Sequence, residues 1–159
     1  MLTRFCYAAL FLPNAVTMMC AADSPPIPKQ FSASIGGFMG ASYDLELHDG
    51  TLTYTTFDAG HRNPRRAAIK PTAAQWREFR QALDDLKVWQ WRAEYPTNDT
   101  LDGTQWGPGI AYADRALKTH GDNNYPDGTG KPNGKPEPTR AFNLYLAAVR
   151  KLTGGKTFE

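Results

Sequence analysis

The histidines are the first residues of this chain that could do chemistry. They are His48, His61 and His120, and none has a second histidine or a cysteine at the short spacing that zinc sites use. His48 and His120 come near the ends of expected hairpins, where exposed histidines are common. The sequence therefore predicts no metal site and no cofactor.

Two stretches rich in aspartate, asparagine and glycine are similar to calcium loops, but both lack required ligands. In residues 122–133, Pro126 takes the place of the fifth-position ligand and Asn133 that of the bidentate glutamate. In residues 98–109, Gly109 stands where that glutamate belongs. Ordinary turns explain both stretches better.

Nucleophilic and acid–base catalysis have no support from sequence motifs. The chain has no Gly-x-Ser-x-Gly element, no phosphate loop and no recognisable Ser-His-Asp or Cys-His pattern. Asp102, Asp114 and Asp122 lie in one half of the chain, but 16 acidic residues bring such groups together by chance. We therefore predict that the protein is not an enzyme. An enzyme would require His48, His120 and an aspartate to meet in one pocket.

Surplus aromatic residues are better candidates for binding. Six of them exceed what two helices need for their buried faces, namely Trp89, Trp91, Tyr95, Trp106, Tyr112 and Tyr125. Exposed rings of this kind bind proteins or stack on sugars, although any single ring is more commonly part of a core. A carbohydrate-binding module that uses Trp89, Trp91 and Trp106 is the alternative to a protein-binding module.

The elements that must position these residues occur twice in the sequence. At an offset of 65 residues, Leu45, Leu47, Asp49, Leu52 and Tyr54 correspond to Ile110, Tyr112, Asp114, Leu117 and Thr119. At an offset of 66 residues, Trp76, Phe79, Leu83 and Leu86 correspond to Phe142, Tyr145, Val149 and Leu152. Each half is therefore expected to form an antiparallel hairpin followed by a helix with one buried face.

Local signals set the bounds of these elements. Asp49-Gly50 predicts a two-residue hairpin turn. Thr72 and Gln75 form a capping box at the start of the first helix. The second helix is expected over residues 139–152, because two glycines follow at positions 154 and 155.

Three connections are expected to be irregular. An alternating strand over residues 31–35 runs into a glycine-rich turn over residues 36–40. Residues 59–70 are interpreted as a polar loop that carries three arginines. Residues 121–138 hold four glycines and four prolines, so we expect residues 121–126 to dock on the domain and residues 127–138 to be mobile.

The first 22 residues have the features of a secretory signal. Arg4 precedes a mostly apolar run that is too short to cross a bilayer, which takes about 20 residues, and Cys20-Ala21-Ala22 offers small residues for cleavage. Residues 23–30 are then an extended leader and residues 31–159 a single domain. The predicted location is periplasmic or extracellular in a bacterium. In the alternative, lipidation of Cys20 would make the protein a lipoprotein, although Met19 is not the small residue expected before it.

Removal of this segment leaves 159 − 22 = 137 residues, with 17 basic and 16 acidic side chains and no cysteine. A domain of that size can form its own core without disulfides. The near-neutral charge gives no electrostatic reason to bind nucleic acid or a membrane. Membrane binding is expected only if Cys20 is lipidated.

The glycine-rich turn carries a family resemblance. Ser34-Ile35-Gly36-Gly37-Phe38-Met39-Gly40 resembles an element of emfourin, a small bacterial inhibitor of thermolysin-like metalloproteases. The positions that match are Gly36, Gly37, Phe38 and Gly40, whereas Ile35 and Met39 depart from the family pattern. The resemblance extends over the order of elements from about residue 31 to residue 152. It implies a binding protein without a catalytic site.

These patterns predict an α+β fold with one antiparallel sheet of about five strands and two helices on one face, built from two strand-strand-helix repeats. The predicted function is an exported protein-binding module without catalytic activity, in its most specific form a protease inhibitor. The predicted partner is a protein such as a secreted metalloprotease. The predicted contact residues are Gly36, Gly37, Phe38, Gly40, Asp102, Trp106, Asn123 and Tyr125.

Export can be tested directly on the processed protein. When the full chain is produced with its native leader in a bacterial host, we expect intact-mass measurement of the exported form to give a chain that begins at Asp23. A mass that corresponds to a lipid-modified Cys20 would contradict this prediction and support membrane anchoring.

Overall fold

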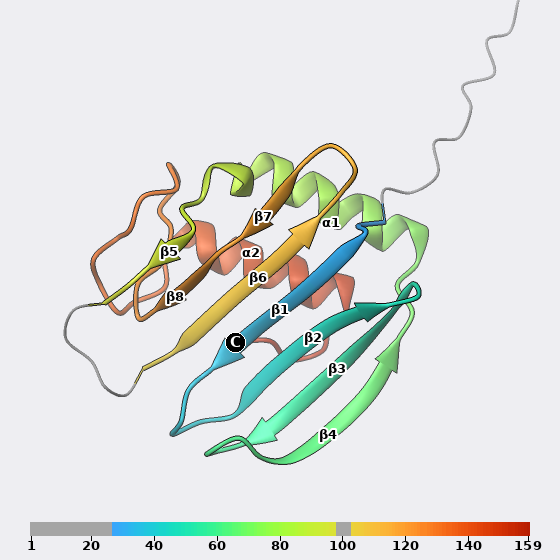
Figure 1. The fold of residues 1–159 in the computed structure, drawn as a ribbon, viewed down its shortest axis with the longest axis horizontal. Coiled ribbons are helices and arrows are strands. Elements are labelled where there is room, and N and C mark those ends of the chain that lie inside the picture. The colour runs from blue at the N-terminus through green and yellow to red at the C-terminus, as the bar shows by residue number, and fades with distance from the viewer. Residues whose placement is uncertain (1–26, 98–102) are drawn as a thin grey trace, which may run out of the picture.

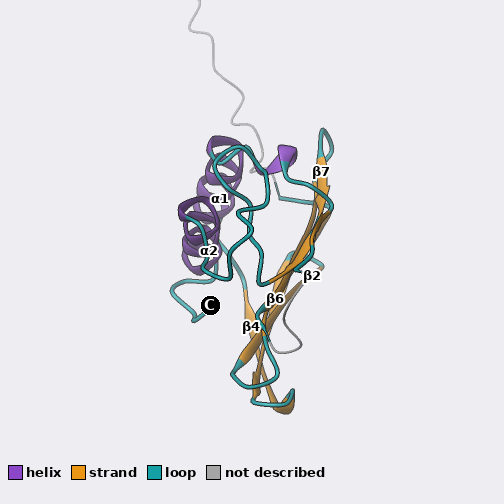
Figure 2. Ribbon diagram, turned by 90° about the vertical axis from the view of Figure 1, so that its left-hand side faces the viewer, coloured by secondary structure: helices purple, strands orange, loops and turns teal. Residues whose placement is uncertain are grey.

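A mostly antiparallel sheet of eight strands carries two helices on one face (Figures 1 and 2). The computed structural model describes residues 27–97 and 103–159. The elements in chain order are β1 (Gln30–Gly36), β2 (Ser42–His48), β3 (Thr51–Asp58), β4 (Arg62–Ile69), α1 (Ala73–Asp85), the 3-10 turn η1 (Val88–Gln90), β5 (Glu94–Tyr95), β6 (Gln105–Ala111), β7 (Ala116–Lys118), β8 (His120–Asp122) and α2 (Arg140–Leu152). The predicted α+β class is confirmed, but the sheet is larger than the five strands expected.

Strand β1 lies in the middle of the sheet, whose order is β4-β3-β2-β1-β6-β8-β5. It pairs antiparallel with β2 on one side and with β6 on the other. β7 and β8 both pair with β6 and act as one interrupted strand. β5 adds to β8 in parallel. The two halves of the chain therefore share a single sheet.

Residues 59–70 do not form the polar loop that the sequence predicts. They contain β4, an eight-residue strand at the edge of the sheet that pairs with β3. Its side chains are almost all exposed, so the strand lacks the alternation of apolar and polar residues by which strands are recognised. Pro64 fits this position because an edge strand does not need every backbone N–H for pairing.

The duplicated hydrophobic positions form the core between sheet and helices. Trp76, Phe79 and Leu83 of α1 are buried, as are Phe142, Tyr145, Val149 and Leu152 of α2. The Phe31 ring of β1 meets those of Trp76 and Phe79 edge to face, with centroids 6.0 and 5.4 Å apart. The capping box also forms, because Thr72 accepts a bond from the Gln75 N–H and donates its own N–H to the Gln75 side chain.

The second half buries a cluster of aromatic rings around Trp106. Tyr125 stacks on the Trp106 indole at 13° with centroids 6.1 Å apart, and Phe142 lies 4.7 Å from both rings. Tyr95 lies 5.4 Å from Trp106. Position 121 must be glycine, because a Cβ there would overlap the indole. Docking of residues 121–126 follows from this cluster.

The sequence predicts that residues 127–138 are mobile, which is wrong for residues 127–134, because they are hydrogen-bonded to one another and to the domain. The Asp127 carboxylate accepts bonds from the backbone N–H groups of Thr129 and Lys131. The hydroxyl of buried Tyr95 donates to the Gly130 carbonyl at 2.6 Å. The chain turns back here, with an isolated bridge between residues 126 and 132. The content of glycine and proline does not predict these hydrogen bonds, because they depend on the individual side chains of Asp127 and Tyr95.

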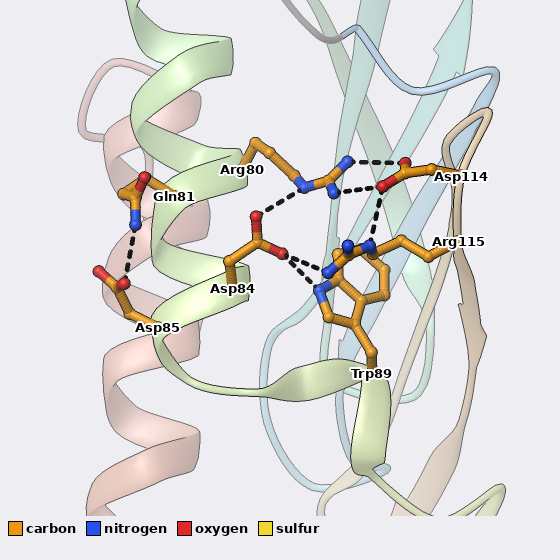
Figure 3. A network of polar contacts seen from close by, with 7 residues as sticks. All are labelled: Arg80, Gln81, Asp84, Asp85, Trp89, Asp114 and Arg115. Atoms are coloured by element: carbon orange, nitrogen blue, oxygen red, sulfur yellow. Dashed lines mark hydrogen bonds and ion pairs between the residues drawn. The ribbon is translucent and has the colours of Figure 1, made fainter.

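A polar network ties α1 to the turn between β6 and β7 (Figure 3). The Arg80 guanidinium bonds Asp84 at 3.0 Å and both oxygens of Asp114 at 2.8 and 3.1 Å. Arg115 joins the same two carboxylates, and the Trp89 indole donates to Asp84. The hydrogen bond from Arg80 holds the pKa of Asp114 well below its usual range.

Arg80 is the member of this network with the most contacts. Its side chain is only 14% exposed, and the guanidinium lies 4.5 Å over the ring of Tyr112 and 5.3 Å over that of Trp89. Burial raises the pKa of Tyr112, so this phenol stays neutral beneath the cation. Arg80 therefore joins helix, turn and sheet through one side chain.

Replacement of Arg80 tests this joint. Arg80→Met keeps an unbranched apolar side chain and the helix propensity but removes the guanidinium group. We expect this substitution to lower the free energy of unfolding by about 1–3 kcal/mol. The control is Gln81→Met on the exposed side of α1, which should change stability by less than about 0.5 kcal/mol. Urea unfolding followed by tryptophan fluorescence measures both. Equal stability of the two variants would show that the network is not a structural joint.

Candidate binding site at the tip of the first hairpin

The connection between β1 and β2 presents two large apolar side chains to solvent. Within this connection, residues 37–41, which we call the tip, Phe38 is 69% and Met39 is 77% exposed. In the described chain the other large exposed apolar side chains are Ile27 and Leu144, which stand apart from it in the sequence. The tip lies at the lower end of the sheet in Figure 1, and the sheet extends beyond the helices at this end (Figure 2).

Two glycines allow the backbone of the tip to fold closely against its neighbours. Gly36 has φ +152°, and a Cβ there would lie 2.6 Å from Cα of Ser42. A Cβ on Gly37 would lie 2.6 Å from the carbonyl oxygen of Gly103. Residues with side chains would force these backbones apart, so two glycines of the family-like element, Gly36 and Gly37, are required by the packing.

The tip is also bonded to the turn between β3 and β4. The Gly60 N–H donates to the Phe38 carbonyl at 2.8 Å, and the Phe38 ring lies against Gly60. In the same turn the rings of Phe57 and His61 pack with centroids 4.7 Å apart. Phe38 and Met39 therefore stand on a held turn rather than on a freely moving loop.

A hollow of about 450 Å³ opens behind the tip on the sheet face that the helices leave uncovered. It is lined by Ser34, Ile35, Gly36, Gly37, Phe38, Ser42, Asp44, His61, Gly103 and Gln105. Burial raises the pKa of the Asp44 carboxyl, and His61 nearby lowers it in part. The lining of the hollow thus combines polar side chains with the aromatic rings of Phe38 and His61.

The structure assigns different places to the residues that the sequence groups as a contact surface. Gly36, Gly37, Phe38 and Gly40 lie together at or beside the tip. Asn123 lies next to them, where its side-chain oxygen accepts the Thr104 N–H at 2.8 Å and its amide fills the space beside Gly103. Asp102 lies outside the described residues.

Trp106 and Tyr125 do not belong to an exposed surface. They are only 3% and 2% exposed, because they stack on each other and on Phe142 inside the aromatic cluster. Trp106 lies on the face of β6 that also buries Ile110, whereas Tyr125 lies in an irregular connection whose sequence does not show which rings are buried. Their prediction as direct contact residues is corrected by this burial.

The tryptophans offer no flat open face to a sugar. All four lie in the described ranges: Trp76, Trp91 and Trp106 are buried. Trp89 is half-buried, with the guanidinium groups of Arg80 and Arg115 over its ring. Sugar stacking needs exposed rings.

The histidines do not meet in one pocket. His48 pairs with Glu46 at 3.2 Å beside one hollow, whereas His120 and Asp122 line another together with Ser34. The Ser34 hydroxyl donates to the Gly107 carbonyl, and no hydrogen bond joins His120 to Asp122 in the described chain. No cluster of three metal-ligating side chains occurs among residues 27–97 and 103–159.

Two residues of the hollow were missed by sequence reasoning. Asp44 is indistinguishable in sequence from any polar residue on the solvent side of an alternating strand. His61 reaches the tip only because β4 forms, and the sequence gives no sign of β4. The neighbouring residues 36–40 were found because three glycines in five positions mark a special backbone.

Comparison with protein-family models finds no family that matches the chain, and comparison with curated proteins finds no similar sequence. In the described part of the chain no helix has the length and apolar character needed to cross a membrane.

Close packing at the tip predicts a difference between two neighbouring glycines. Gly37→Ala should lower the free energy of unfolding by about 1–3 kcal/mol, because its Cβ meets the Gly103 backbone. Gly40→Ala is the matched control, since no heavy atom lies within 4 Å of a Cβ there, and it should change stability by less than about 0.5 kcal/mol. Thermal unfolding of both variants provides the measurement. A Gly37→Ala protein as stable as Gly40→Ala would mean that the tip is not held against residue 103.

Proposed function

We propose that the protein is an exported, non-catalytic binding module that docks on a protein partner through the tip. The observation that carries this proposal is the exposure of Phe38 and Met39 on a turn held by two glycines and by the Gly60 bond. Large apolar side chains that are exposed to water at a tip are unfavourable in free energy, and a partner that covers them removes this cost. Because the turn is held in place, little conformational entropy is lost when it binds.

The kind of partner comes from the resemblance of the same residues to emfourin. Gly36, Gly37, Phe38 and Gly40 are the positions that match that family, and they coincide with the exposed apolar turn. We therefore propose a secreted thermolysin-like metalloprotease as the partner and inhibition as the outcome. The predicted location, periplasmic or extracellular, would bring the two proteins together.

The carbohydrate-binding alternative has less support than protein binding. It needs exposed rings at Trp89, Trp91 and Trp106, and the second and third of these are buried. The tip contributes one phenylalanine and one methionine, which suit a protein surface better than the face of a sugar ring.

Inhibition assays on tip variants test the proposal. The wild-type chain at micromolar concentration should inhibit a thermolysin-type protease, and Phe38→Ala with Met39→Ala should weaken inhibition by about 10- to 100-fold, because buried apolar anchors dominate such interfaces. Leu144→Ala is the control, since Leu144 is a 48% exposed apolar residue of α2 away from the tip. Pull-down from periplasmic extract with the same three proteins extends the test to other partners. Inhibition and capture that survive the double substitution would overturn the proposal.

A further inference from the structure

A half-buried carboxylate lines the hollow behind the tip and makes no ion pair within the described chain. Asp44 belongs to β2, opposite Ser34 of β1 and Thr55 of β3. Burial raises the pKa of its carboxyl, His61 nearby lowers that pKa in part, and Glu46 raises it further. In the described chain no hydrogen bond or ion pair is formed by this carboxylate, whereas the exposed Asp58 nearby binds Arg65 and Asn63. A partly desolvated carboxylate of this kind is stabilised when a cation pairs with it.

The other polar groups of the hollow suit a cation as well. The hydroxyl of Ser34 donates to the Gly107 carbonyl and that of Ser42 to the Gly37 carbonyl, both at 3.4 Å. With their hydrogens used in this way, these oxygens remain as acceptors. Gln105 adds a side-chain amide on the opposite wall. The hollow therefore offers acceptors around one negative charge.

The rim of the hollow suits the apolar stem of a long side chain. Phe38 and His61 line it, and the Phe38 ring lies against Gly60 at the same turn. Aromatic rings attract an adjacent cation and pack against methylene groups. The volume of about 450 Å³ is at the small end of ligand pockets.

We infer that the hollow is a recognition pocket for a basic side chain, arginine or lysine, supplied by the protein that docks on the tip. This inference rests on the proposed function and adds a specificity element to it. Phe38 and Met39 supply the apolar contact with the partner. Asp44 favours a partner whose basic side chain extends from that contact into the hollow. A metal ion is a poor alternative, because Asp44 is the only carboxylate among the described residues that line the hollow.

Titration with small cationic probes tests the pocket without the partner. The probe is acetyl-arginine amide, with acetyl-lysine amide as a second cation and acetyl-citrulline amide as the uncharged isostere of arginine. We expect both cations to shift the backbone NMR resonances of residues 34–44 and 61 during the titration. The citrulline probe should bind with an affinity at least about tenfold lower. Equal shifts with citrulline, or shifts confined to another surface, would overturn the inference.

Two aspartate variants make the test specific. Asp44→Asn removes the charge with little change of shape and should weaken the arginine probe at least about tenfold, with the amide spectrum otherwise preserved. Asp49→Asn is the matched control, since Asp49 lies in the β2–β3 turn at φ 48°, where asparagine is also tolerated, and it does not line the hollow. Unchanged binding by Asp44→Asn would overturn the inference.

The outcome can be separated from that of the proposed function. If the arginine probe binds through Asp44 but the tip variants inhibit and capture as well as wild type, the proposed docking fails and the pocket stands. If the tip variants lose inhibition but the probe does not bind, docking stands and the pocket fails.

Discussion

The pairing of β1 with β6 is the contact on which the rest of the structure depends. It runs over seven residue pairs and joins the two halves of the chain into one sheet. Toward the helices β1 buries large side chains, including Phe31 and Ile35. Toward solvent Ser32 opposes Gly109, and a Cβ on that glycine would lie only 2.8 Å from the serine oxygen. The junction therefore has large side chains on the face that the helices cover and small residues on the other, as suits a sheet with helices on one face only.

The position of the tip follows from this junction. Because β1 is paired on both sides, its end at Gly36 has little freedom, and the turn that follows must begin in a fixed direction. The bond from Gly60 fixes the turn a second time from β3 and β4. Asp44 of β2 pairs with Ser34 of β1, so the hollow and the apolar tip are both supported by these two paired strands. A surface supported in this way binds without first having to order itself.

The elements that the sequence reveals are those that bury one regular face or use special turn residues. Both helices and the Asp49-Gly50 hairpin are confirmed, since their signals are local and periodic. The strand β4 and the two-residue β5 escape notice because neither buries a regular stripe. The prediction that Tyr125 is an exposed contact residue is wrong for a related reason, because its burial depends on long-range stacking on Trp106 and Phe142 that no local pattern encodes. The prediction for Trp106 is wrong as well, although the alternation of β6 places this ring on the same face as buried Ile110.

The exposed strand β4 has a further consequence for how the molecule behaves at high concentration. An edge strand of eight residues that is paired on one side only would normally offer its free backbone groups to the same strand of another copy. Here Pro64 removes one donor from that ladder, and Arg62, Arg65 and Arg66 would bring like charges together if two such edges met. The residues that hide this strand from sequence inspection are therefore also ones that oppose edge-to-edge pairing between molecules.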